Sequence, residues 1–464
     1  MVIKMIDSEM QKQTVKSENA QKDEGVTLLT VFIIALASCI ALWALILALS
    51  RLDAGLELFF GKFADFLADY RNVAANIVDF DPYREFLPFF PANNPAMSYL
   101  IILPFALIAR NDFLAYGARD WTYNNFFLRA LSLLLFFAVA FTVITVLTFK
   151  HLKASKKQKI LFLILLLFSY PFLFLIERGN ALLYCLMFLM IYFCYYKSEK
   201  KRVREFAIVS LAIAINIKFY CAVFVILLFK EYKFLPCVRL VLYSAFWFVA
   251  PFLCFKGGLS NISRFMGYFQ RSLNEHHLTG PYGFLVGNHS LDAFLYNAGI
   301  TKSYTAGWIS VVKYCILIFG AFFCICLKNR SESLILAACL AVVFPILSFS
   351  YILVIFLLPL LVFLNSEKLS KRNIPLLVFL IFIFSPLQYG VINRDSVGVG
   401  VDSVLKSFFI LVMVFYLMWA GAKDFYALIK NKQLKGICTG YLSGIRLELS
   451  EAKSALTKTF KAKK

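Results

Sequence analysis

Long apolar runs recur along the whole chain and are separated by short polar stretches. One run covers residues 26–50 and another covers residues 127–149. A run of about 20 apolar residues is long enough to cross the hydrocarbon core of a bilayer as a helix. Of the 464 residues, 61% are hydrophobic and 16% are charged, whereas soluble domains have an apolar share of about 45–50%. The chain is therefore expected to be an all-α polytopic membrane protein.

The apolar and polar stretches divide the chain into three parts. Residues 1–25 are polar with mixed charge, residues 26–421 hold the apolar runs, and residues 422–464 are rich in lysine. We expect a cytoplasmic N-terminus, a transmembrane domain of about ten to thirteen helices that includes re-entrant or interfacial helices, and a basic cytoplasmic tail. The N-terminal segment is too polar for a signal peptide, so the first apolar run is expected to remain as a span.

The basic residues predict the orientation of the chain. The formal net charge is +21, and lysines and arginines gather in short stretches between apolar runs, such as residues 150–159 and 197–204. Short basic loops of this kind face the cytoplasm, and their placement argues against a nucleic-acid partner. Two longer polar loops, residues 51–95 and 255–305, are then expected on the outer face.

Residues 206–229 have basic residues at both ends and a single Lys218 in the middle. Two alternatives fit this pattern: a re-entrant pair of short helices broken near residues 216–218, or one ordinary span with a weak charge signal. A lysine within an apolar stretch is costly unless it has a partner or a function. We therefore interpret Lys218 as a functional or paired residue rather than one that only reaches toward the interface.

The acidic residues are concentrated in the first outer loop. Residues 51–95 carry seven of them: Asp53, Glu57, Asp65, Asp69, Asp79, Asp81 and Glu85. Aromatic and aliphatic residues lie between these carboxylates, which predicts short amphipathic helices along the membrane surface. The exception is the stretch around Pro82, where Asp79 and Asp81 indicate a turn. A loop of this kind can hold a carboxylate at the edge of the lipid, where it could deprotonate a hydroxyl.

Cysteine placement and motif searches predict neither a metal nor a cofactor. All of the eleven cysteines except Cys438 lie in apolar runs, which predicts packing residues rather than a disulfide framework. His276 and His277 lie in an expected loop with only Glu275 beside them as a further ligand type, so no metal site is expected there. The sequence has no P-loop, HExxH, GxSxG or dinucleotide-binding pattern.

Glu177 and Arg178 stand at the outer end of an apolar run, just before Gly179 and Asn180. In one interpretation, Arg178 binds a phosphate at the level of the lipid headgroups through charge-assisted hydrogen bonds. In the other, Glu177 and Arg178 form an interfacial pair that only caps helices. The sequence leaves both open.

Several short motifs occur in the order seen in a known family. They are Asp65-Phe-x-x-x-Tyr70, Asn94-Pro95-Ala96-x-x-Tyr-Leu, Arg178-Gly179-Asn180, the single Lys218 that closes a small-residue helix, and Gly287-Asn288-His289-Ser290-Leu291. Over residues 55–365 the chain resembles glycosyltransferase family 87, the polyprenyl-phosphate-mannose-dependent mannosyltransferases of the membrane-embedded C-class (GT-C) fold. The chain departs from the family where Asn180 and His289 replace glutamine, at the degraded Asn94-Pro95-Ala96 element, and in the missing proline after Lys218.

The resemblance implies an enzyme of the outer face of a membrane, expected to be the bacterial inner membrane. It would transfer a hexose such as mannose, or a pentose, from a polyprenyl-monophosphate donor to a lipid or glycan acceptor. A single carboxylate base would deprotonate the acceptor in a displacement that inverts the anomeric centre. The expected partners are this donor, the acceptor and membrane lipids, and no cofactor is implied.

The resemblance also implies roles for single residues. Asp65 matches the aspartate of the first motif and is the expected base. Asp69 is the second candidate, because residues at i and i+4 share one face of a helix. The residues expected to bind the donor phosphate are Arg178, Lys218, Arg271 and His289. The residues expected to bind the substrates are Tyr70, Asn94, Asn180, Gln270 and Asn288.

Two other classes of protein share some of these features. A flippase or transporter of lipid-linked sugars could use the interrupted segment 206–229 as its substrate site, although the inverted repeats typical of such proteins are not visible. A glycan polymerase or ligase also has many spans and one large outer loop, but no acidic first loop would be expected in it.

Overall fold

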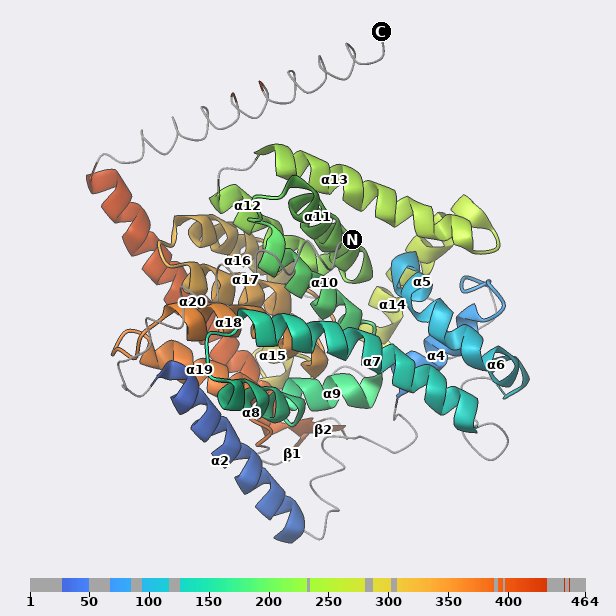
Figure 1. The fold of residues 1–464 in the computed structure, drawn as a ribbon, viewed down its shortest axis with the longest axis horizontal. Coiled ribbons are helices and arrows are strands. Elements are labelled where there is room, and N and C mark those ends of the chain that lie inside the picture. Colours follow the sequence, from blue (N-terminus) through green and yellow to red (C-terminus); the bar gives the residue numbers. More distant parts are fainter. Residues whose placement is uncertain are drawn as a thin grey trace.

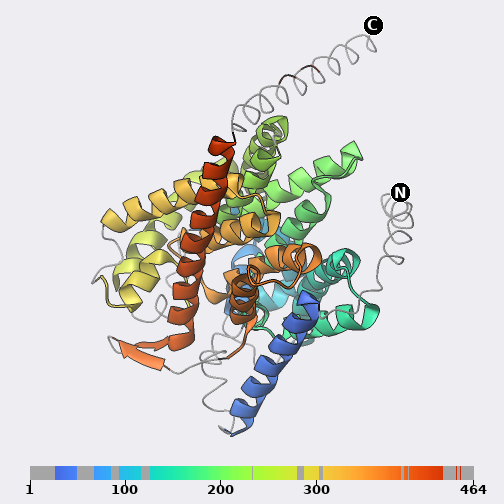
Figure 2. The same ribbon diagram turned by 90° about the vertical axis from the view of Figure 1, so that its left-hand side faces the viewer.

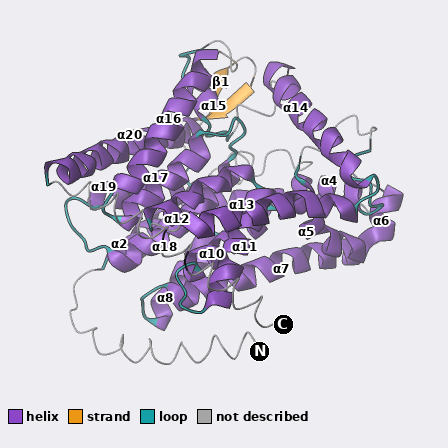
Figure 3. Ribbon diagram, turned by 90° about the horizontal axis from the view of Figure 1, so that it is seen from above, coloured by secondary structure: helices purple, strands orange, loops and turns teal. Residues whose placement is uncertain are grey.

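The computed structural model describes residues 27–49, 67–84, 94–116, 126–231, 234–279, 287–301, 307–387, 391–394 and 397–431, together with residues 446 and 450. These residues are mostly helical (Figures 1 and 3). In chain order the α-helices and 3-10 helices (η) are α2 (Leu28–Leu49), α4 (Ala68–Ile77), α5 (Ala96–Ala106), η2 (Leu107–Ala109), α6 (Arg110–Tyr116), α7 (Phe126–His151), α8 (Lys156–Leu167), α9 (Tyr170–Arg178), α10 (Leu182–Tyr195), α11 (Lys201–Ile217), η3 (Phe219–Val225), α12 (Ile226–Lys230), α13 (Phe234–Val249), η4 (Ala250–Cys254), η5 (Gly258–Ser260), α14 (Asn261–Thr279), α15 (Leu291–Asn297), α16 (Gly307–Cys326), α17 (Arg330–Val343), η6 (Ser350–Phe356), α18 (Leu357–Ser366), α19 (Ile374–Phe384) and α20 (Val401–Lys430).

One β-hairpin interrupts this helical fold. Strand β1 (Val391–Arg394) pairs antiparallel with β2 (Val397–Gly400), with Val391 opposite Gly400. The β-branched residues of these two segments favour extended backbone. The all-α prediction is therefore correct for the bulk of the described chain and misses this hairpin.

Several helices are long and apolar enough to cross a membrane, as expected of a multi-pass membrane protein. Among the described residues there are six, and a bent pair brings the number to seven. They cover Leu28–Leu49, Ala96–Ala115, Phe127–His151, Phe234–Cys254, Gly307–Cys326 and Val401–Lys430, and the pair is α8 with α9, bent by 55°. The larger number of spans predicted from the sequence is not confirmed.

The long helices turn apolar side chains outward, whereas a shorter helix forms the centre. Only 22% of the apolar window of α2 is buried inside the protein, as expected for a helix that faces lipid. Figures 1 and 2 show α2 in blue, extending away from the other helices. It packs against α8 and α19. In contrast, α17 is buried from Ser331 to Val343 and contacts α16, α18, α20 and η3.

The segment of residues 206–229 is interrupted at Lys218, so the alternative of one ordinary span is wrong. Helix α11 ends at Ile217, Lys218 is extended with φ −143° and ψ 109°, and η3 begins at the next residue. The Nδ2 of Asn216 donates to the carbonyls of Ala212 (2.9 Å) and Ser244 (3.0 Å). Ser98 Oγ donates to the carbonyl of Ile217 (3.2 Å). Ser98 thus gives the carbonyl of Ile217 a partner that a continuing helix would otherwise supply, and Asn216 ties the end of α11 to α13.

The predicted first outer loop contains a short helix, α4, which begins at Ala68 after Leu67, whose φ is 57°. The face that Asp65 was predicted to share with Asp69 stays a prediction. Asp65 itself lies outside the described residues. The predicted turn after α4 is confirmed: Asp79 Oδ1 accepts from the backbone N–H of Asp81 (3.1 Å), and Asp79 forms an ion pair with Arg84 (2.5 Å).

Two further expectations are corrected by helices. His276 and His277 were expected in a loop, but the backbone of residues 261–279 forms α14, in agreement with its amphipathic sequence. The apolar run expected to end at residue 421 continues as α20 to Lys430. Figure 3 shows α14 at the same end of the molecule as α4 and α6.

Gly179 lets α4 approach the end of α9 closely. Its φ is +62°, and a Cβ at this position would lie 2.8 Å from Tyr70 Cβ. The neighbouring Leu67 N–H donates to the carbonyl of Glu177 (2.6 Å). We expect Gly179→Ala to lower the free energy of unfolding by about 1–3 kcal/mol, because it adds backbone strain and a clash.

The measurement is the thermal unfolding midpoint of the purified protein in detergent. Gly267→Ala on α14 is the matched control, because nothing lies within 4 Å of its added Cβ. Equal midpoints for the two variants would show that the contact between α4 and α9 does not depend on Gly179.

Candidate functional site

A cavity of about 1030 Å³ lies among α4, the start of α5, the interrupted segment around Lys218, and helices α16 and α17. Helix α4 contacts α5 and α9, while η3 contacts α17 and α12 contacts α16. The cavity therefore joins the segment that contains α4 to the interior of the helical bundle. Four of the residues predicted as site residues line it: Asp69, Asn94, Asn180 and Lys218.

One face of α4 supplies polar groups to the cavity. Asp69, Asn72 and Asn76 all line it, together with Val73. Their spacing of three and four residues places them on one side of a helix. The opposite side of α4 is buried through Tyr70, Ala74 and Ile77, so the amphipathic pattern of this helix fixes which residues face the cavity.

Asp69 is held in place by the residues that follow α9. Its Oδ1 accepts a hydrogen bond from Arg178 Nη2 (2.7 Å), and its Oδ2 accepts one from Asn180 Nδ2 (2.6 Å). Asn180 Oδ1 in turn accepts from the backbone N–H of Leu182 (2.9 Å). Each carboxylate oxygen has two lone pairs, so each keeps one for another donor.

This pairing changes the interpretation of Arg178. The guanidinium binds Asp69 and does not line the cavity. The structure therefore places Arg178 where it positions Asp69, and the charge of Glu177 also acts on its guanidinium. Phosphate binding by Arg178 stays a prediction.

Lys218 is an available cation on the cavity wall. Within the described part of the chain, its Nζ forms no hydrogen bond or ion pair with the protein, and Asp69 acts on it only through the electrostatic field. The other cavity lysine, Lys313, forms a buried ion pair with Asp292 (2.5 Å). An unpaired ammonium in an enclosed site is expected to bind an anionic ligand.

The remaining lining is largely apolar. It comes from η3, α12, α16 and α17 and includes Val223, Ile226, Leu317, Ala321, Leu340 and Ala341. These elements pack against one another away from α4. Helix α16 also adds the polar residues Ser310 and Lys313 to this lining. A cavity that combines polar groups with a largely apolar wall suits an amphiphilic ligand.

Tyr70 and His289 are buried and do not line the cavity. The hydroxyl of Tyr70 lies 2.5 Å from Ser132 Oγ. The Nδ1 of His289 lies 3.0 Å from Ser407 Oγ, and its Nε2 lies 3.2 Å from Ser350 Oγ. Burial, together with the charge of Lys406, lowers the pKa of His289 to about 3. His289 is therefore a neutral residue of the interior, and its predicted role at the donor phosphate stays a prediction.

The three other predicted residues also lie off the cavity. Gln270 and Arg271 are exposed on α14, and the guanidinium of Arg271 lies 6.0 Å from the centre of the Tyr268 ring. Asn288 bonds to the backbone of a neighbouring segment: its Nδ2 donates to the carbonyl of Ile346 (3.0 Å), and its Oδ1 accepts from the N–H of Ser348 (3.1 Å). It thus fixes the segment of residues 344–349, most of which lines the cavity.

Sequence reasoning missed several polar residues of the cavity, among them Asn72, Asn76 and Lys313. The spacing of the two asparagines from Asp69 is a helical signal that could have identified them once α4 was assumed. Lys313 stands alone in an apolar run, as Lys218 does, and the same argument about buried charge applied to it.

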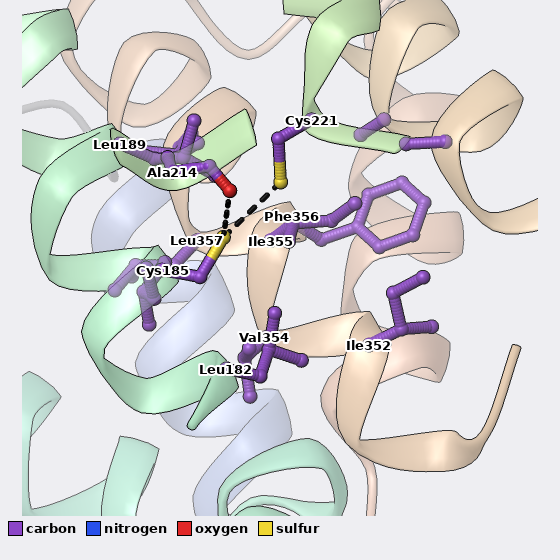
Figure 4. Packing of buried hydrophobic residues seen from close by; sticks show 14 of the residues in the cluster. Leu182, Cys185, Leu189, Ala214, Cys221, Ile352, Val354, Ile355, Phe356 and Leu357 are labelled. Atoms are coloured by element: carbon purple, nitrogen blue, oxygen red, sulfur yellow. Dashed lines mark hydrogen bonds between the residues drawn. The ribbon is translucent and has the colours of Figure 1, made fainter. Parts of the chain in front are cut away.

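Two cysteines pack behind the cavity wall. Cys185 Sγ on α10 lies 3.1 Å from Cys221 Sγ on η3, and it also lies 3.5 Å from the carbonyl of Ala214 (Figure 4). Both are buried and free, in agreement with the predicted role of cysteines as small packing residues. Among the described residues, no group of three His, Cys, Asp or Glu could hold a metal ion.

No family model and no curated protein matches this chain. The likeness to glycosyltransferase family 87 therefore rests on the short ordered motifs alone.

Proposed function

We propose that this chain is a membrane glycosyltransferase that moves a sugar from a polyprenyl-monophosphate donor to a hydroxyl of a lipid or glycan acceptor. The observation that carries the proposal is the cavity whose lining combines Asp69, many apolar residues, and Lys218, which has no protein partner among the described residues. A polyprenyl phosphate needs a cation for its headgroup and an apolar groove for its chain. The motif order over residues 55–365 supports the same class of enzyme.

The reaction is a single displacement at the anomeric carbon. The acceptor oxygen forms a bond to this carbon while the bond to the phosphate oxygen breaks, and the electron pair leaves with the lipid phosphate. Lys218 balances the charge of the departing phosphate. A carboxylate takes the proton of the acceptor hydroxyl. Of the two candidates, Asp69 is the one that lines the cavity, and Asp65 is the alternative base.

This chemistry would take place on the outer face of a membrane, which we propose to be the bacterial inner membrane. The positive-inside rule places the basic stretch of residues 150–159 in the cytoplasm. In this proposal only one of the two apolar helices between that stretch and α4, Ala96–Ala115 and Phe127–His151, crosses the membrane, so that the segment containing α4 lies on the other side. The proposal then places the cavity opening toward the outer leaflet, where a flipped lipid-linked donor would be present.

The interruption at Lys218 also favours a second candidate, a flippase of lipid-linked sugars. Transporters often bind substrate where a helix is broken, and here the break lines the cavity. Such a protein would move the lipid-linked sugar across the membrane without breaking the bond between sugar and phosphate.

A direct assay separates the two functions. Purified protein in nanodiscs is incubated with a panel of polyprenyl-phosphate sugars and a lipid or glycan extract as acceptor, with heat-denatured protein as the control. We expect one sugar of the panel to be transferred, with release of free polyprenyl monophosphate. Transport of the intact donor in proteoliposomes, without any release of lipid phosphate, would show a flippase instead.

A further inference from the structure

Asn72 and Asn76 have unused hydrogen-bonding groups in the cavity. Both are half-buried and line it. Within the described residues, neither side chain forms a hydrogen bond to the protein. A carboxamide offers two donor hydrogens and an acceptor oxygen. Two such groups, one helical turn apart, match the alternating donors and acceptors of neighbouring sugar hydroxyls.

Helix α4 presents these groups on a rigid support. At its start, Leu67 N–H donates to the carbonyl of Glu177 (2.6 Å). At its end, the Nε of Arg110 donates to the carbonyl of Val78 (3.1 Å), and the N–H of Lys256 donates to the carbonyl of Phe80 (2.7 Å). A preorganised face of this kind loses little freedom when a ligand binds.

We propose that Asn72 and Asn76 form the subsite that recognises the sugar of the donor. This inference rests on the proposed function and names the residues that select the sugar. The sugar would lie along α4, the phosphate beside Lys218, and the lipid chain against α16 and α17. Among the described lining residues, the other cation, Lys313, is already paired with Asp292. The site therefore suits a neutral hexose or pentose better than a uronic acid.

The test compares two lipids that differ only in the sugar. The probes are a short-chain polyprenyl phosphate and the same lipid carrying mannose or glucose, with binding measured in detergent. We expect Asn72→Ala and Asn76→Ala each to lower affinity for the glycosylated lipid by about 5- to 10-fold, the range for one or two lost neutral hydrogen bonds. Affinity for the bare lipid phosphate should stay within about twofold of wild type, which also reports that each variant is folded.

Asn111→Ala is the matched control, because Asn111 is an exposed asparagine on α6 that does not line the cavity. It should leave both affinities unchanged. Equal losses for both lipids, or no loss for either, would overturn the sugar subsite. If the wild-type protein binds neither lipid, the proposed function itself fails, and this outcome is distinct from a failure of the asparagine subsite alone.

Discussion

Replacing Lys218 by methionine is expected to lower the affinity for a polyprenyl-phosphate donor by about 10- to 100-fold, since a charge-assisted hydrogen bond contributes about 1.5–3 kcal/mol. Methionine keeps much of the length of the side chain and removes only the ammonium. Because the Lys218 ammonium has no protein partner among the described residues, its loss leaves no buried carboxylate without its counter-ion. The variant should therefore remain folded.

The measurement is donor binding, followed by single-turnover kinetics at saturating donor. Lys256→Met is the control, because Lys256 has an exposed side chain, lies in the predicted outer loop of residues 255–305 and does not line the cavity. Unchanged donor affinity in Lys218→Met would show that the donor phosphate does not bind beside Lys218. Arg178→Ala provides a second comparison: we expect it to impair turnover through Asp69 more than it impairs donor binding.

Asp69→Asn is expected to reduce turnover by about 100-fold or more while donor binding is retained, because asparagine keeps the shape of the side chain and loses its basicity. The contact with Arg178 (2.7 Å) weakens as well, so the unfolding midpoint of the variant is measured beside its activity. Asp69→Glu should recover part of the activity, since it restores a carboxylate near the same place. Loss of turnover in Asp69→Asn at an unchanged unfolding midpoint would separate a role as base from a structural role.

Asp65→Asn is measured in parallel because Asp65 is the alternative base. Asp79→Asn is the matched control: Asp79 belongs to the same acidic segment, forms an ion pair with Arg84, and does not line the cavity. If Asp65→Asn shows no turnover while Asp69→Asn is active, the base is Asp65. If both variants turn over at the wild-type rate, no carboxylate of this segment is the base, and the proposed mechanism is wrong.

The residues of the cavity show which parts of a site can be predicted from local sequence. Lys218 was identified correctly as unusual, because a charge within an apolar stretch stands out wherever the chain folds. Asp69, Asn94 and Asn180 were also among the predicted site residues and do line the cavity. In contrast, Tyr70 and His289 also belong to the ordered motifs yet lie in the interior. A motif marks a segment, but the orientation of each side chain depends on which helix face is buried.

The sequence by itself determined the membrane class and the positions of most helices, since apolar runs of sufficient length have few alternatives to helices in lipid. It also narrowed the segment around Lys218 to two arrangements. Only the tertiary structure decided that α11 ends there, because the partners of its last residues, Ser98 and Ser244, come from distant parts of the chain. The tertiary structure likewise brought Arg178 to Asp69, across a separation of 109 residues. Contacts of this kind arise from helix packing, which local sequence patterns do not specify.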